Sequence, residues 1–281
     1  MYTITVNGVA TQTEKNQSLL SYLRDELRIT SVKNACGEGA CGACTVLADG
    51  RKQRACLLTT QKADGKRILT VEGLTPREKD VYAHCFAEAG AVQCGFCIPG
   101  MVISAKALLD ATLTPTRAEV KQAIRGNICR CTGYVKIEDA ILMAAEYFRE
   151  GKPVPMAQDN GLLGRDMHRV DAAAKVLGTG LFTDDIVLPG MIYAKALRSR
   201  FPRARVVRLD VSRALTHPDV VRVLTAADVP FNKTGHLVPD WDVMIAQGDV
   251  TRYIGDAVAL VATRSPDTLD EALALIDVEY E

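Results

Sequence analysis

The sequence predicts an α+β protein of several domains, in which two small cysteine-bearing domains precede a mixed α/β region. Three observations support this fold class. Alternating apolar residues and tight turn dipeptides indicate strands and hairpins in the first 76 residues. Apolar residues at helical spacing dominate residues 77–152, and strand-like and helical segments are mixed in residues 170–281. With 281 residues, the chain is long enough for two or three domains with cores of their own.

Residues 1–76 are predicted to form a β-grasp-like domain. The dipeptides Asn7-Gly8 and Asp49-Gly50 lie between strand-like segments and predict two hairpins, the second of which leads back to Cys56. Residues 68–71 indicate one further strand. Ser18 precedes an apolar stripe at helical spacing, which predicts a helix packed across the sheet. The stripe consists of Leu19, Leu20, Leu23 and Leu27.

The first cysteine set lies in this domain. Cys36, Cys41 and Cys44 have the spacing C-x4-C-x2-C, and Cys56 follows as a distant fourth cysteine. This spacing is typical of plant-type ferredoxins that hold a 2Fe-2S cluster. Glycines at 37, 39 and 42 would let the loop turn tightly and direct backbone N–H groups at the sulfurs. A structural zinc site is the alternative, but zinc ribbons pair two C-x2-C knuckles, so the spacing favours iron-sulfur.

Residues 77–152 are predicted to form a four-helix bundle. Helices are expected at 79–89, after Pro99-Gly100, after Thr116 and at 137–148. Thr116 and Glu119 have the spacing of a capping box, which supports the start of the third helix.

The second cysteine set lies between these helices. Cys94 and Cys97 form a C-x2-C pair, and Cys129 and Cys131 form a C-x-C pair, so both pairs could grip one metal centre. A second 2Fe-2S cluster is the natural interpretation, although this spacing alone leaves zinc open. The ninth cysteine, Cys85, lies in a helical run and is expected to be a buried structural thiol.

The rest of the chain carries weaker signals. Prolines and glycines without periodicity predict a linker at 153–169. In residues 170–281, strands are expected at 193–197, 206–211, 257–262 and 276–280, and a helix from Ser265-Pro266 to residue 275.

Composition gives no support for a nucleic-acid or membrane partner. The 34 basic and 34 acidic residues cancel, and aromatic residues make up only 5% of the chain. The N-terminus resembles no secretory signal, and no apolar run approaches the length of a membrane span, so we expect a cytoplasmic protein. In that reducing compartment, nine cysteines indicate metal ligands more readily than disulfides.

The cysteine motifs resemble those of the molybdenum hydroxylases, a family that includes xanthine dehydrogenases and aldehyde oxidoreductases. Besides the first cysteine set, they are Gln93-Cys94-Gly-Phe-Cys97 and Asn127-Ile-Cys129-Arg-Cys131-Thr-Gly-Tyr134. Residues 170–281 resemble the hammerhead opening of the family's molybdenum-binding region, at 171–178, 184–185, 188–191 and 254–259. Only a linker lies where some members have an FAD domain.

The resemblance implies an electron path through two 2Fe-2S clusters. Electrons from a molybdopterin centre that hydroxylates a purine such as xanthine, or an aldehyde, would reach the cluster of Cys94, Cys97, Cys129 and Cys131 first. The cluster of Cys36, Cys41, Cys44 and Cys56 would pass them to FAD, on a partner subunit, or to an external acceptor. Gln93 and Cys131 match family residues that lie close to the pterin.

The resemblance assigns no catalytic residue to this chain. The family's main molybdenum-binding segments lie beyond the position of Glu281, so a separate molybdenum-binding subunit or a missing C-terminal region is expected to supply them. The chain alone is therefore expected to be incomplete for catalysis. Two alternatives remain: a stand-alone two-cluster electron carrier, and a zinc-stapled interaction module.

Overall fold

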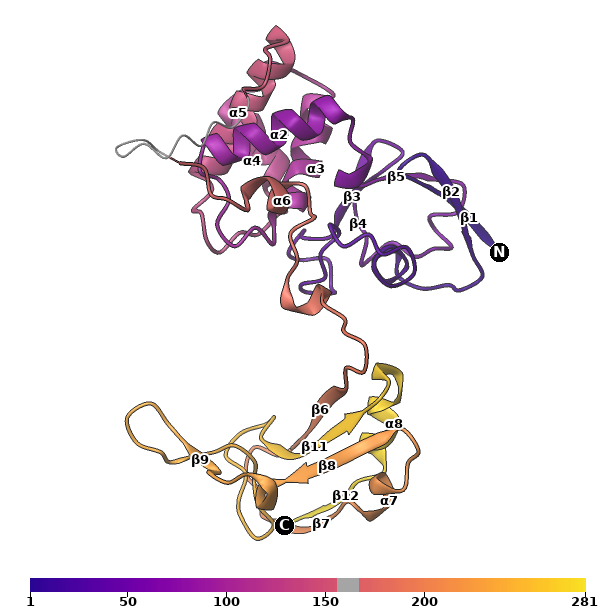
Figure 1. Ribbon diagram of the computed structural model, residues 1–281, viewed down its shortest axis with the longest axis vertical. Coiled ribbons are helices and arrows are strands. Elements are labelled where there is room, and N and C mark those ends of the chain that lie inside the picture. Colours follow the sequence, from indigo (N-terminus) through magenta and orange to yellow (C-terminus); the bar gives the residue numbers. More distant parts are fainter. Residues whose placement is uncertain (156–166) are drawn as a thin grey trace. The chain divides into compact units, whose positions relative to one another are not determined.

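The computed structural model describes residues 1–155 and 167–281 (Figure 1). Two compact units make up this part of the chain: unit 1 comprises Met1–Asp185 and unit 2 comprises Ile186–Glu281. Most of the linker predicted at 153–169 lies outside the described residues. Within the described residues, none of the helices has the length and apolar character needed to cross a membrane.

Unit 1 contains a five-stranded sheet in the order β2-β1-β5-β3-β4. Both predicted hairpins are confirmed: Asn7 and Gly8 have φ of 50° and 87°, and Asp49 and Gly50 have φ of 49° and 76°, as their tight turns require. Strand β5 pairs parallel with β1 and antiparallel with β3. The strands are β1 (Tyr2–Val6), β2 (Val9–Thr13), β3 (Thr45–Ala48), β4 (Arg51–Arg54) and β5 (Arg67–Leu69).

The strand predicted at 68–71 is wrong at its C-terminal end. β5 stops at Leu69, and Val71–Gly73 forms a 3-10 turn. The reason is a side chain from the first hairpin: the Asn7 carboxamide oxygen accepts the Thr70 N–H at 2.9 Å and so replaces a ladder partner.

The predicted helix across the sheet is confirmed in part. Ser18 caps α1 (Leu19–Ser21), as expected, but the chain then continues as a π-helical segment (Tyr22–Glu26) that the sequence did not indicate. Leu19 and Leu23 are fully buried against the sheet.

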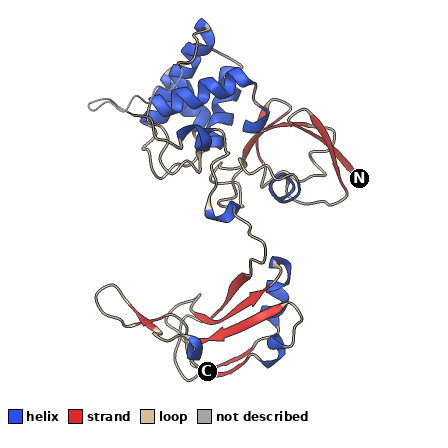
Figure 2. Ribbon diagram, viewed as in Figure 1, coloured by secondary structure: helices blue, strands red, loops and turns tan. Residues whose placement is uncertain are grey.

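The predicted four-helix bundle is confirmed, and its helices lie on one side of the sheet (Figure 2). The capping box of Thr116 and Glu119 is present, and a second one, Thr75 with Glu78, starts the first helix three residues earlier than predicted. The helices are α2 (Pro76–Glu88), α3 (Ile98–Leu109), α4 (Arg117–Ile124) and α5 (Val135–Glu150).

A fifth, short helix joins this bundle. Helix α6 (Ala172–Val176) contacts α2 and α3, and Ala172 and Val176 are buried in the core of the helices. Its chain runs on through a 3-10 turn (Thr183–Asp185). We call residues 171–185 the strap. Although it follows the predicted linker in sequence, the strap packs on unit 1.

Unit 2 is built from small antiparallel sheets and short helices (Figure 2). Strand β11 is the centre of a three-stranded sheet in the order β6-β11-β8 and is buried on both faces, as its apolar run predicted. β12 pairs with β7, and β10 pairs with β9. The strands are β6 (Tyr193–Arg198), β7 (Val206–Asp210), β8 (Val220–Thr225), β9 (Lys233–Thr234), β10 (Trp241–Asp242), β11 (Ala257–Thr263) and β12 (Asp277–Tyr280).

Short helices cover the sheets of unit 2. They are α7 (Ser212–Leu215) and α8 (Leu269–Ala274), with 3-10 turns at Ala226–Asp228 and Pro266–Thr268. The predicted helix after Ser265-Pro266 is present as the second 3-10 turn and α8, with Ser265 as its cap. Ala214 of α7 and Ala272 of α8 pack with Val261 of β11 in one core. The predicted α+β fold class is thus confirmed in both units.

Candidate iron-sulfur sites

The first cysteine loop has the backbone that its glycines predict. Gly37, Gly39 and Gly42 have φ of 69°, 84° and 73°, so the loop turns three times within a few residues. The backbone N–H of Cys41 points at the Sγ of Cys36 at 3.5 Å. Hydrogen bonds from the amides of Cys41 and Glu38 lower the pKa of Cys36 to about 6, which favours the thiolate form that an iron ligand needs.

The four sulfurs of the first set gather as two pairs. The Sγ atoms of Cys44 and Cys56 lie 3.4 Å apart, and a side-chain interaction pairs Cys36 with Cys41. Cys44 lies under the loop and its burial raises the pKa of the thiol to about 11, whereas Cys36 and Cys41 are partly exposed. Cys56 is partly exposed as well, but both Cys44 and Cys56 pack with the apolar core of the first domain.

The second set forms two pairs in the same way. Cys94 and Cys131 are exposed and their Sγ atoms lie 3.7 Å apart. Cys97, at the start of α3, pairs with Cys129, and its pKa is raised by burial and by the Cys129 sulfur. Burial acts to raise the pKa of Cys129 as well, but the Thr132 hydroxyl and backbone N–H groups outweigh it and lower that pKa.

These pairs fit a 2Fe-2S cluster better than a zinc ion. Tetrahedral zinc bonded to sulfur at about 2.3 Å brings all four sulfurs within about 3.8 Å of one another. In a 2Fe-2S cluster, each iron takes two cysteine sulfurs, so a two-plus-two arrangement is expected. In residues 1–155 and 167–281, no three His, Cys, Asp or Glu side chains converge as they would on a single metal ion.

The two cysteine loops are joined directly. The N–H of Ile128 donates to the carbonyl oxygen of Cys41 at 2.8 Å, and the side-chain amide of Asn127 donates to the carbonyl of Gly42 at 2.9 Å. Asn127 is buried, and its carboxamide oxygen accepts the Ser104 hydroxyl at 2.7 Å. A Cβ at Gly42 would lie 2.2 Å from the carbonyl oxygen of Gly126, so the loops touch through backbone.

The remaining predicted residues lie as follows. Gln93 is exposed beside Cys94 at the edge of the second quartet, where Cys131 is also exposed. Cys85 is fully buried in α2, as predicted for a structural thiol, and its burial raises its pKa to about 12. All nine cysteines lie in the described residues and are free thiols.

Sequence reasoning missed the residues that hold the strap against the cysteine loops. Asp185 pairs with Arg24 at 2.9 Å and with the fully buried Lys33 at 3.4 Å. Lys175 donates to the carbonyl oxygen of Cys94 at 2.7 Å. No spacing rule connects residues that are 81 to 161 positions apart, so the sequence pattern holds no signal for these contacts.

Three family models match the chain. One described as 2Fe-2S iron-sulfur cluster binding domain matches residues 4–75, and one described as 2Fe-2S binding domain matches residues 70–142. A third, described as aldehyde oxidase and xanthine dehydrogenase, a/b hammerhead domain, matches residues 177–281. The order of two iron-sulfur domains and a hammerhead domain is the predicted one.

Known proteins resemble the chain over different lengths. An aldehyde oxidoreductase of Megalodesulfovibrio gigas is 34% identical over 99% of this chain and 33% of its own length. The nicotinate dehydrogenase small FeS subunit of Eubacterium barkeri is 47% identical over 51% of this chain and 93% of its own length. The crystal structure of an aldehyde oxidoreductase from Desulfovibrio desulfuricans matches with a TM-score of 0.87 and 32% identity, over 100% of this chain and 33% of that one. The chain thus spans about a third of these aldehyde oxidoreductases.

Proposed function

Because this chain belongs to the molybdenum hydroxylase family of aldehyde oxidases and xanthine dehydrogenases, we propose that it is the electron-transfer part of such an oxidoreductase. Residues 1–76 would carry one 2Fe-2S cluster and residues 77–152 the other. Residues 153–169 would link them to a hammerhead-like region at 170–281. The eight cysteines of the two quartets would all serve as iron ligands, so the role of unit 1 would be to hold and relay electrons.

Each quartet supplies the ligands for one cluster. Cys36 and Cys41 would hold one iron of the first cluster, and Cys44 and Cys56 the other, because these are the sulfur pairs. By the same reasoning, Cys94 pairs with Cys131 and Cys97 with Cys129 in the second cluster. When bound, a 2Fe-2S cluster supplies reversible one-electron chemistry at a potential set by its surroundings.

The contact between the two loops carries the proposal. Cys129 is covalently continuous with Ile128, whose N–H donates to the Cys41 carbonyl at 2.8 Å. A single hydrogen bond therefore connects a ligand of one quartet to a ligand of the other. A structural staple has no need of this connection, whereas a relay needs its two redox centres close together and rigidly held.

We propose that electrons enter at the exposed edge of the second quartet. Gln93, Cys94 and Cys131 are exposed there, and we propose that this edge faces a molybdopterin held by a separate subunit or a further region of the chain. The partly exposed pair Cys36 and Cys41 would deliver electrons to FAD on a partner or to an external acceptor. Purines such as xanthine, and aldehydes, are the substrate classes we propose for the complete enzyme. We place the protein in the reducing cytoplasm, which suits nine cysteines that form no disulfide.

Metal analysis and reductive titration of the anaerobically purified chain test this function. We expect about four iron and four sulfide per chain and uptake of about two electrons, one for each cluster. Zinc without iron and sulfide would contradict the proposal and favour an interaction module. From its native source, the chain should co-purify with molybdopterin. Isolation as a molybdenum-free monomer with both clusters would favour a stand-alone carrier.

A further inference from the structure

We propose that Lys175, carried by the strap, raises the reduction potential of the cluster held by Cys94, Cys97, Cys129 and Cys131. The inference rests on the proposed function, because it presupposes a 2Fe-2S cluster at that quartet. The strap contributes no ligand to either cluster, and its role would be to tune the potential of the second one.

Lys175 packs against the loop that carries Cys94 and Cys97. Its ammonium group donates a hydrogen bond to the carbonyl oxygen of Cys94 at 2.7 Å. Its stem lies across Gly95, where a Cβ would come within 2.5 to 2.8 Å of three stem carbons. Gly95 also has a φ of 84°, so this position requires glycine twice over. The side chain of Lys175 is only 11% exposed, which holds the charge beside the loop and limits screening by water.

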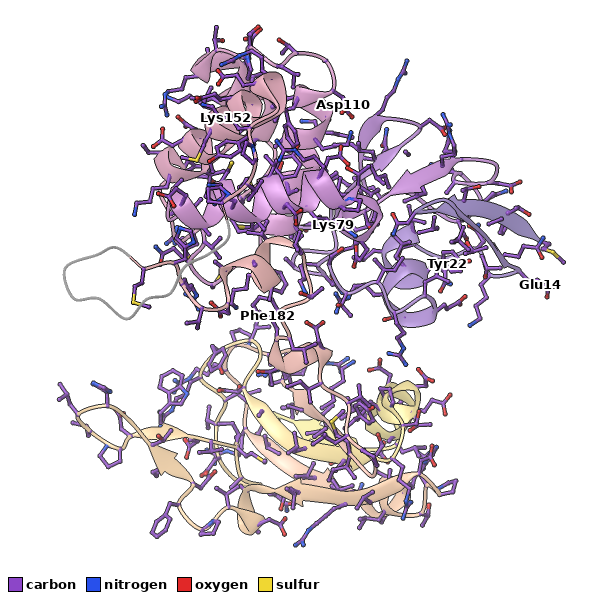
Figure 3. All side chains as sticks on the ribbon, turned by 45° about the horizontal axis from the view of Figure 1, so that its top comes forward. Glu14, Tyr22, Lys79, Asp110, Lys152 and Phe182 are labelled. Carbon is purple, nitrogen blue, oxygen red and sulfur yellow. The ribbon has the colours of Figure 1, made fainter. Side chains whose placement is uncertain are left out.

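Aromatic and charged neighbours fix the position of this lysine. The ammonium lies 4.4 Å from the centre of the Phe182 ring, a cation–π contact. Phe182, labelled in Figure 3, belongs to the strap, and its ring packs edge-on against Phe96 of the C-x2-C loop at 5.2 Å. The strap and the loop therefore grip each other at two points, through Lys175 and through Phe182.

Two further charged side chains lie near the Lys175 ammonium and partly neutralise each other. Asp171 lies 3.7 Å from the Lys175 ammonium, and its carboxylate also pairs with Arg169. Two cations therefore face one carboxylate, and the carboxylate is 40% exposed whereas the lysine is nearly buried. The net formal charge of these three side chains is therefore +1.

The physical effect follows from the charge of the cluster. Reduction adds one negative charge, so a fixed cation nearby stabilises the reduced form and raises the potential. The hydrogen bond to the Cys94 carbonyl acts in the same direction, because it draws electron density away from a ligand residue. A higher potential at this cluster favours electron transfer into it from the donor.

Potentiometric EPR titration of the full chain with both clusters assembled tests the proposal. Lys175→Gln should lower the equilibrium constant for one-electron reduction of the second cluster about three- to tenfold, or about 30 to 60 mV at 59 mV per tenfold change. The first cluster should keep its potential. Lys175→Arg should keep the potential of the second cluster close to the wild-type value, since it keeps the positive charge.

Two further variants separate charge from structure. Asp171→Asn removes the opposing carboxylate from the surface and should shift the second cluster in the opposite direction, to a higher potential. Lys79→Gln removes a lysine of α2 that is labelled in Figure 3. Lys79 lies nine residues, or about 13 Å along the helix, before Glu88, and Glu88 is at the end of α2 that leads to the Cys94 loop. This control should leave both potentials unchanged.

The outcomes are distinct. An unchanged second potential in Lys175→Gln, an equal shift in Lys79→Gln, or a lower potential in Asp171→Asn would each overturn the role of Lys175. Absence of a second 2Fe-2S signal in the wild-type chain would instead overturn the proposed function itself.

Discussion

Cys131 is the ligand whose replacement separates the two clusters most cleanly. Its side chain is exposed, and its sulfur lies 3.7 Å from the sulfur of Cys94. Both residues belong to the helical domain, whereas the first quartet belongs to the domain before it. Cys131→Ala should remove the second cluster and leave the first, because the core of unit 1 does not depend on this side chain. Iron content should fall by about half, with one of two EPR signals remaining.

Cys85 provides the control for that experiment. It is fully buried in α2 and belongs to the apolar core of the helices, where it forms no pair with a cysteine of either quartet. Cys85→Ala should keep both EPR signals while costing about 1 kcal/mol of stability for the small cavity. Two EPR signals in Cys131→Ala, or the loss of one in Cys85→Ala, would show that the ligands are assigned wrongly.

Two glycines of the first loop differ in a way that a pair of alanine variants can measure. Both Gly37 and Gly42 have positive φ, so alanine costs about 1 to 2 kcal/mol at either position. Only at Gly42 would the new methyl group meet backbone, at 2.2 Å from the Gly126 carbonyl oxygen; at Gly37 the space is open. Gly42→Ala should therefore cost about 2 kcal/mol more than Gly37→Ala.

Thermal unfolding and iron analysis check this difference. Gly42→Ala should also lower the rate of electron transfer between the clusters, because Gly42 is next to Cys41, whose carbonyl accepts the hydrogen bond from Ile128. Equal midpoints for the two variants would mean that the loops are not packed against each other as described.

At the residue scale, spacing identified the eight proposed ligands but not how they pair. The C-x4-C-x2-C pattern predicts a tight loop, and the positive φ of Gly37, Gly39 and Gly42 confirms it. The pairing of Cys44 with Cys56, and the role of Asn127 in joining the loops, depend on tertiary contacts between residues far apart in sequence. No periodicity records such contacts.

The strap is the element whose anchoring is most easily tested. The Asp185 side chain is 3% exposed and pairs with Arg24 and with Lys33, which is 1% exposed. Burial acts to raise the pKa of Asp185, but Arg24, the Phe182 amide and Lys33 outweigh it and hold that pKa below its usual value. Burial also lowers the pKa of Lys33, and Asp185 opposes that effect.

Asp185→Asn should therefore destabilise unit 1 by about 3 kcal/mol, because it leaves the Lys33 ammonium buried without its anion. In thermal unfolding this corresponds to about 6 to 12 °C. Asp49→Asn is the matched control: Asp49 pairs with Lys66 on the surface, with both side chains at least 40% exposed, and should cost under about 1 kcal/mol. Equal effects of the two changes would show that the buried pair is not what holds the strap.

The difference in stability between the wild type and Asp185→Asn should depend on pH with a definite sign. A carboxylate with a lowered pKa adds stability above its unfolded pKa, near 4, and loses it as the pH falls through the still lower folded pKa. The gap in melting temperature between wild type and Asp185→Asn should therefore be constant from about pH 5 to pH 8. A gap that closes within this range would identify a different titrating group.

At the element scale, capping signals and turn dipeptides were informative because their physics is local. Both hairpins and the Thr116–Glu119 capping box follow from such signals. The sequence reasoning did not identify α6, whose five residues are too few to show a repeating helical pattern, or the π-helical segment after Ser21. The end of β5 was misplaced because Asn7, 63 residues away, captures the Thr70 amide.

At the scale of the whole molecule, unit 1 gathers both quartets, the hydrogen bond between their loops and the strap that carries Lys175. The order of the domains was predictable, because the two cysteine motifs and the matches in residues 170–281 resemble the same family in the same order. The strap's attachment to unit 1 was not, since residues 171–185 follow the predicted linker and only folding brings them back to the cysteine loops.

EPR of the dithionite-reduced full chain, with spin quantitation, tests the central claim most directly. Two quartets joined through Cys41 and Ile128 predict two distinct 2Fe-2S signals of about one spin each. A single signal, or an EPR-silent chain that contains zinc, would contradict the account.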